Sequence, residues 1–85
     1  MTTVCRKRLE EARANVTSLR FGNLCALAEC FGWVVVRQKG SHRIYKRNGS
    51  MVLMNFQEDR NGRAKPLQVR QLLAAIDELM QSEDL

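Results

Sequence analysis

A single histidine lies in a short basic segment, the run Arg37-Gln38-Lys39-Gly40-Ser41-His42-Arg43. An imidazole can accept or donate a proton near neutral pH, which few other side chains can do. A glycine allows a phosphate to approach the backbone closely, and a serine hydroxyl can donate a hydrogen bond to a phosphate oxygen. Together with Lys46, this segment therefore combines a base with several cations.

These residue types are the ones that metal-independent cleavage of RNA requires. A base removes the proton of a ribose 2′-hydroxyl, the oxygen attacks the adjacent phosphorus, and cations stabilise the charge that develops. His42 is the candidate catalytic residue, although by spacing alone a lone histidine in a turn is more often a surface or capping residue. The predicted RNA-binding residues are Arg37, Lys39, Gly40, Ser41, Arg43 and Lys46. Four sources of the proton for the leaving oxygen stay open, namely water, a lysine, Tyr45, or His42 acting a second time.

Neither a metal nor a cofactor is expected. Glu58 and Asp59 are adjacent in the sequence, so their carboxylates would point apart. The three cysteines are an odd number without a Cys-x-x-Cys pair, and one histidine cannot complete a zinc site with them. On a helix, Cys25 and Cys30 would face different sides. We therefore expect three reduced, mostly buried thiols and no disulfide.

The charge of the chain is unevenly distributed. The 85 residues are expected to form one domain, and the formal net charge is +5. Residues 37–70 carry nine basic and two acidic side chains, whereas residues 71–85 carry four acidic side chains and no basic one. A basic region of this kind is typical of a surface that faces a polyanion, although a surplus of solvated lysines and arginines explains it equally well. No apolar run is long enough to span a membrane and no secretory signal is visible, so we expect a cytoplasmic protein.

Apolar spacing and turn residues predict an α+β fold. Helical spacing predicts one helix over Asn23–Phe31 and a second from Pro66 to about Met80, the latter from Val69, Leu72, Leu73, Ile76 and Met80. Residues Thr3–Ala14 could form an additional short polar helix, with Leu9 and Ala12 facing inward. Between the two main helices we expect three antiparallel strands, joined by turns at Lys39-Gly40 and Asn48-Gly49. The predicted strands are Trp33–Val36, His42–Arg47 and Ser50–Phe56, followed by a loop over Gln57–Lys65.

The expected turns sort the strands into two faces. With a two-residue turn at Asn48-Gly49, Tyr45 pairs with Val52 and His42 pairs with Asn55. The face expected under the helices holds Val34, Val36, Tyr45, Val52, Met54 and Phe56, with Arg43 as its basic member. The face expected to be open holds Trp33, Val35, Ile44, Met51 and Leu53 together with Arg37, His42, Lys46 and Asn55.

Several of these elements together resemble the HicA family of toxins. The resemblance covers about residues 19–80, in order and at compatible spacing. It is carried by Gly32-Trp33, Arg37 to His42, Ile44-Tyr45, Lys65-Pro66 and Val69-Arg70-Gln71-Leu72-Leu73. On this basis we divide the single domain 1–85 into an N-terminal extension (1–19), a HicA-like core (20–80) and an acidic tail (81–85).

The resemblance implies a fold like that of the double-stranded-RNA-binding domain, in the order α-β-β-β-α, with both main helices on one face of a three-stranded antiparallel sheet. It also implies a toxin of a type II toxin–antitoxin pair, which cleaves mRNA independently of the ribosome through His42. The implied partners are single-stranded mRNA and a HicB-like antitoxin that covers the active surface.

Two other classes of function fit the same residues. A non-catalytic RNA-binding module of this fold would bind phosphates through its basic residues and would need no imidazole. A protein-interaction module would use the apolar residues of the open face, such as Trp33, to bind a partner.

Overall fold

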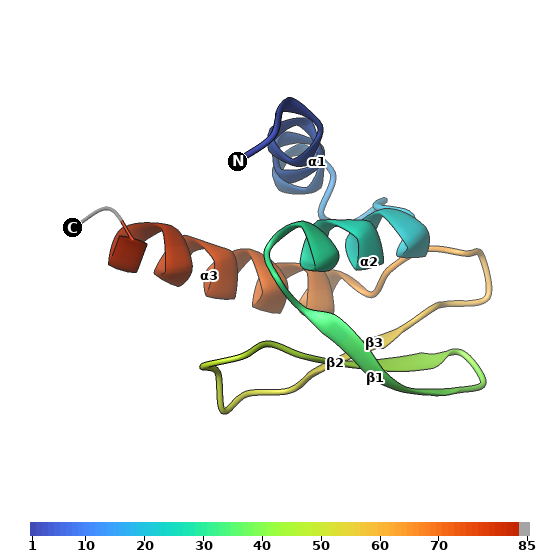
Figure 1. Ribbon diagram of the computed structural model, residues 1–85. Coiled ribbons are helices and arrows are strands. Elements are labelled where there is room, and N and C mark those ends of the chain that lie inside the picture. Colours follow the sequence, from blue (N-terminus) through green and yellow to red (C-terminus); the bar gives the residue numbers. More distant parts are fainter. Residues whose placement is uncertain (84–85) are drawn as a thin grey trace.

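Three helices and one three-stranded antiparallel sheet make up the computed structural model, which describes residues 1–83 (Figure 1). The elements are α1 (Thr3–Ala14), α2 (Phe21–Cys30), β1 (Val34–Lys39), β2 (His42–Lys46), β3 (Met54–Gln57) and α3 (Pro66–Glu83). The strand order is β1-β2-β3. The prediction of an α+β fold with the α-β-β-β-α order, and with an additional helix in front, is confirmed.

The helices α2 and α3 cover one face of the sheet, and α1 lies on the outer side of these two helices (Figure 1). The core forms between α2, α3 and the sheet because each of these elements turns an apolar side toward the others. Its buried residues include Leu24, Leu27, Ala28, Tyr45, Met54, Phe56, Val69, Leu72 and Ile76. Each large side chain buried in this way contributes about 1.5–3 kcal/mol. Among the described residues, no helix covers the opposite face of the sheet (Figure 1).

The N-terminal helix follows its predicted bounds. The hydroxyl of Thr2 accepts a hydrogen bond from the Cys5 backbone N–H at 3.1 Å, which caps the first turn of α1. Leu9 and Ala12 are buried, as their spacing predicted. The helix α2 begins at Phe21, two residues before the predicted start, because the Phe21 backbone N–H donates to the carbonyl oxygen of Gly62.

The pairing predicted between the second and third strands is wrong by two residues. Asn48-Gly49 does form a turn, in which the Ser50 N–H donates to the Arg47 carbonyl oxygen at 3.1 Å. The strands, however, pair only from Met54 onward, opposite Tyr45. This register places Phe56 beside Tyr45, with ring centroids 5.5 Å apart under the helices. A shift of two residues keeps every side chain on its predicted face. It leaves Met51, Val52 and Leu53 in an exposed loop, so Val52 is not a core residue.

The faces predicted for the start of the first strand are also wrong. Trp33 is only 2% exposed, whereas Val34 and Val36 are exposed. The Trp33 backbone N–H donates to the carbonyl oxygen of Ala28, which keeps the indole against the end of α2. An irregularity between Val35 and Arg37 then changes the alternation of faces along β1.

The expectation of three reduced cysteines is wrong as well. Cys5 and Cys30 form a disulfide with a Cα–Cα distance of 5.7 Å, and only Cys25 is a free, buried thiol. The bond joins the first turn of α1 to the C-terminal end of α2. These two segments meet because α1 packs against α2, a contact that cysteine spacing alone does not reveal.

The C-terminal segment is more helical than expected. The helix α3 starts at Pro66, as predicted, and continues to Glu83, so residues 81–83 belong to a helix rather than to a tail. Asp84 and Leu85, the rest of the predicted acidic tail, lie outside the described residues. Within residues 1–83, no helix is both long enough and apolar enough to cross a membrane.

Candidate active site

A hollow of about 450 Å³ lies on the open face of the sheet. All three strands and the turn between β1 and β2 contribute to it. The lining residues are Arg37, Lys39, Gly40, Ser41, His42, Ile44 and Asn55. The structure thus brings five of the seven predicted site residues together in one place.

The turn between β1 and β2 positions the cations beside the imidazole. Lys39 pairs directly with His42, which leaves Gly40 and Ser41 as the two turn residues instead of the predicted Lys39-Gly40. Gly40 has a φ of +59°, and no non-glycine residue in the described chain has a positive φ. A glycine at the first turn position fits a type II′ hairpin. Because directly paired residues share a face, the side chain of Lys39 lies beside that of His42.

The imidazole of His42 is exposed and has one side-chain partner. Its Nδ1 lies 3.4 Å from Oδ1 of Asn55 on β3. An amide oxygen can only accept a hydrogen bond, so Nδ1 carries the proton and donates it. The neutral ring then has its free lone pair on Nε2, the ring atom that is available to accept a proton. Asn55 was not among the predicted site residues, although the predicted open face did include it.

Two predicted RNA-binding residues do not line the hollow. Arg43 points to the helix side of the sheet, where its guanidinium carbon lies 5.3 Å from the centre of the Phe21 ring. A hydrogen bond with Tyr45 raises the pKa of Arg43, with partial burial acting in the opposite direction. Lys46 is exposed on the open face but pairs with Val34 at the far end of β2.

The structure removes one source of the proton for the leaving oxygen. Tyr45 is fully buried on the helix side, and its hydroxyl donates to Oε2 of Glu29 at 2.9 Å. Burial, reinforced by hydrogen bonds with Cys25 and Glu29, raises the pKa of Tyr45. Because side chains of adjacent residues on a strand alternate between faces, this phenol cannot reach a substrate bound beside His42.

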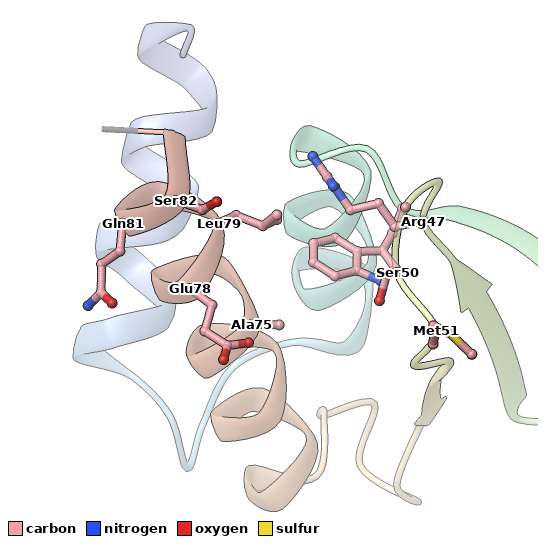
Figure 2. A pocket seen from close by; sticks show the side chains of 10 residues that line it. Arg47, Ser50, Met51, Ala75, Glu78, Leu79, Gln81 and Ser82 are labelled. Atoms are coloured by element: carbon pink, nitrogen blue, oxygen red, sulfur yellow. The ribbon is translucent and has the colours of Figure 1, made fainter. Parts of the chain in front are cut away.

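A larger hollow of about 660 Å³ lies between the last turns of α3 and the loop after β2 (Figure 2). Figure 2 shows Glu78, Leu79 and Ser82 along the helix on one side and Arg47 on the other. The Arg47 Nε–H donates to the Phe31 carbonyl oxygen at 2.7 Å, so this guanidinium is already engaged in the fold. His42 does not line this larger hollow, which therefore lacks the base that the cleavage of RNA would need.

A comparison with protein-family models identifies residues 23–77 as a match to the HicA toxin of bacterial toxin–antitoxin systems. The chain belongs to the HicA toxin family. It is therefore the toxin of a toxin–antitoxin pair and has an antitoxin as its partner protein. The match to the HicA family runs from α2 into α3 and includes every residue of the hollow, whereas α1 lies outside it. Neither a curated protein nor a solved structure matches the chain.

Proposed function

We propose that this HicA-family toxin is a metal-independent endoribonuclease that cleaves mRNA at the hollow around His42. The observation that carries the proposal is an exposed imidazole, oriented by Asn55, in a hollow that Arg37 and Lys39 also line. A single base beside two cations meets the requirements of intramolecular attack by a 2′-hydroxyl.

In the proposed reaction, Nε2 of His42 accepts the proton of the 2′-hydroxyl. The 2′-oxygen forms a bond to the adjacent phosphorus, and the bond from phosphorus to the 5′-oxygen breaks. The products are a 2′,3′-cyclic phosphate and a 5′-hydroxyl. The guanidinium of Arg37 and the ammonium of Lys39 stabilise the negative charge on the phosphorane. The 5′-oxygen takes its proton from water, from a lysine, or from the imidazolium of His42.

The hollow suits a single-stranded substrate better than a regular duplex. In-line attack needs a ribose and phosphate that are free to rotate, and the bases of an A-form helix hold them in place. We therefore propose single-stranded mRNA as the substrate, cleaved in the cytosol independently of the ribosome. We further propose that a HicB-like antitoxin inhibits the toxin by covering the exposed residues of the hollow.

The discriminating experiment incubates the chain with a single-stranded RNA in the presence of EDTA and examines both the mobility and the length of the RNA. The proposal predicts fragments that end in 2′,3′-cyclic phosphate and an unchanged rate when magnesium is omitted. A mobility shift without fragments would instead identify a non-catalytic RNA-binding module. A strict requirement for added magnesium would contradict the proposed mechanism.

A further inference from the structure

A second cluster of cations lies next to the hollow but does not line it. The segment between β3 and α3, residues 58–65, carries Arg60, Arg63 and Lys65, and the neighbouring Arg20 precedes α2. All four side chains are exposed. Within residues 1–83, one pair of oppositely charged side chains has a nitrogen-to-oxygen distance below 4 Å, namely Arg13 and Asp77. None of the four cations of the cluster therefore forms an ion pair at that distance.

The 58–65 segment is held in one conformation by its own hydrogen bonds. Oδ1 of Asp59 accepts from the Asn61 N–H at 2.8 Å and from the Arg63 N–H at 2.9 Å. The Asp59 N–H in turn donates to the Arg63 carbonyl oxygen at 2.9 Å. The guanidiniums of Arg60 and Arg63 therefore extend from an ordered backbone, which reduces the entropy that they lose when they bind a ligand.

Backbone contacts join this segment to the turn between β1 and β2 on one side and to Arg20 on the other. The Glu58 N–H donates to the Ser41 carbonyl oxygen at 3.1 Å, directly beside His42. An isolated antiparallel bridge pairs Arg63 with Arg20. A Cβ placed on Gly62 would lie 3.2 Å from Nη2 of Arg20, so this guanidinium lies over the segment.

The arrangement gives the molecule a basic end. The turn between β1 and β2, the 58–65 segment and the start of α2 all lie at one end of the molecule, and the end of α3 lies at the other (Figure 1). Asp77 and Glu78 belong to the last turns of α3. Glu58 is the one exposed carboxylate of the 58–65 segment. A polyanion is therefore attracted to the end of the molecule that holds His42.

We propose that Arg20, Arg60 and Arg63 form a second phosphate-binding surface, which holds the RNA backbone next to the hollow in which the bond is cut at His42. The inference rests on the proposed function, since it takes RNA as the ligand. Guanidinium groups suit this role because they bind phosphate oxygens through two parallel hydrogen bonds. The contacts reach only the backbone of the RNA, so they increase affinity without selecting a sequence.

The test compares two double variants that lose the same charge. One is Arg60→Gln with Arg63→Gln, and the matched control is Arg6→Gln with Lys7→Gln on α1, where both side chains are exposed. Each is made in a His42→Ala chain, so that binding is measured without cleavage. The ligand is a fluorescent single-stranded RNA of roughly twenty nucleotides, titrated by anisotropy over a range of salt concentrations.

We expect the Arg60/Arg63 variant to bind at least about tenfold more weakly than the control at low salt, with a salt slope reduced by about 0.7 for each lost phosphate contact. Replacing both arginines by lysine keeps the two positive charges and should therefore restore most of the salt dependence of the affinity. Equal affinity of the two glutamine variants would overturn the inference. Circular dichroism checks that both variants are folded.

Failure of this inference can be separated from failure of the proposed function by cleavage assays in chains that retain His42. If the parent cleaves RNA and the two glutamine variants bind equally, the proposed second phosphate-binding surface is contradicted and the proposed nuclease activity is supported. If the Arg60/Arg63 variant binds more weakly but the parent does not cleave RNA, the second phosphate-binding surface is supported and the proposed nuclease activity is contradicted.

Discussion

His42 and Asn55 lie on adjacent strands of the open face, with Nδ1 of the ring 3.4 Å from Oδ1 of the amide. In this contact a ring protonated at Nδ1 donates to Asn55 and leaves Nε2 as the other ring nitrogen. We propose that Asn55 is a positioning residue, which acts on the substrate only through the imidazole. Ile44, which pairs with Asn55 across β2 and β3, is an apolar residue that lines the same hollow.

Replacing Asn55 tests this positioning role. We expect Asn55→Ala to lower kcat by about tenfold to a hundredfold, with little change in KM, because the tautomer and orientation of the ring are no longer fixed. Asn55→Asp keeps the acceptor and adds a negative charge beside the ring, which favours the imidazolium over the neutral base. The acidic limb of the pH–rate profile should therefore move to higher pH. An unchanged profile in Asn55→Asp would show that the two side chains do not interact.

Tyr45→Phe tests whether the phenol takes part in catalysis. The variant keeps the ring packed near Phe56 and removes the hydrogen bond to Glu29. We expect a loss of about 1 kcal/mol in the free energy of unfolding, measured with urea, and an unchanged cleavage rate. A fall of the rate by a factor of ten or more, in a variant that remains folded, would place Tyr45 in the reaction.

The pH dependence of stability should reveal the role of Asp59. Hydrogen bonds from backbone N–H groups, that of Arg63 first, lower the pKa of Asp59 below its ordinary value of 3.8. The stabilisation is therefore present above pH 3.8 and is lost as the pH falls through the lower folded value. We expect Asp59→Asn, which keeps an acceptor oxygen but not the charge, to be less stable than the parent at pH 7.

Urea unfolding of the parent and of Asp59→Asn between pH 2 and 7 provides the measurement for that prediction. The difference in unfolding free energy should shrink toward zero at the acidic end. A difference that stays constant over the whole range would mean that the charge of Asp59 does not stabilise the 58–65 segment.

The disulfide between Cys5 and Cys30 should stabilise the fold without affecting the chemistry. Closing a loop between residues 25 positions apart contributes roughly 3 kcal/mol in the chain-entropy model. We expect Cys5→Ser to lose about this much and to unfold at a lower temperature, while Val4→Ser at an exposed neighbouring position changes little. Neither residue lines the hollow, so both variants should cleave RNA at the parental rate. If Cys5→Ser cleaved RNA more slowly than the parent, α1 would influence the active site.

Much of the fold was predictable because its helices have clear local signals. Pro66 and the spacing of Val69, Leu72 and Ile76 predicted α3, and Leu9 and Ala12 predicted the buried side of α1. The strand register was not predictable from the turn residues. Asn48-Gly49 turns the chain as expected, but tertiary packing of Met54 and Phe56 under the helices determines which residues pair.

The site was predictable to the extent that it is local in the sequence. Five of the predicted residues come from one segment around the turn between β1 and β2, and they lie together although the turn residues are Gly40-Ser41 instead of the predicted Lys39-Gly40. Asn55 was missed as a site residue because its role depends on a contact across strands. Arg43 was included for its charge, although the predicted alternation along the second strand had already placed it on the helix side, where the structure has it.

We propose that the imidazole of His42 accepts the proton of the 2′-hydroxyl. The most direct test measures the single-turnover rate of cleavage of one RNA, in EDTA, by the parent and by His42→Ala. Because His42 is exposed, the variant should unfold at nearly the parental temperature. We expect a rate at least about a hundredfold lower for His42→Ala. A variant that is folded and cleaves as fast as the parent, leaving the same 2′,3′-cyclic phosphate ends, would contradict it.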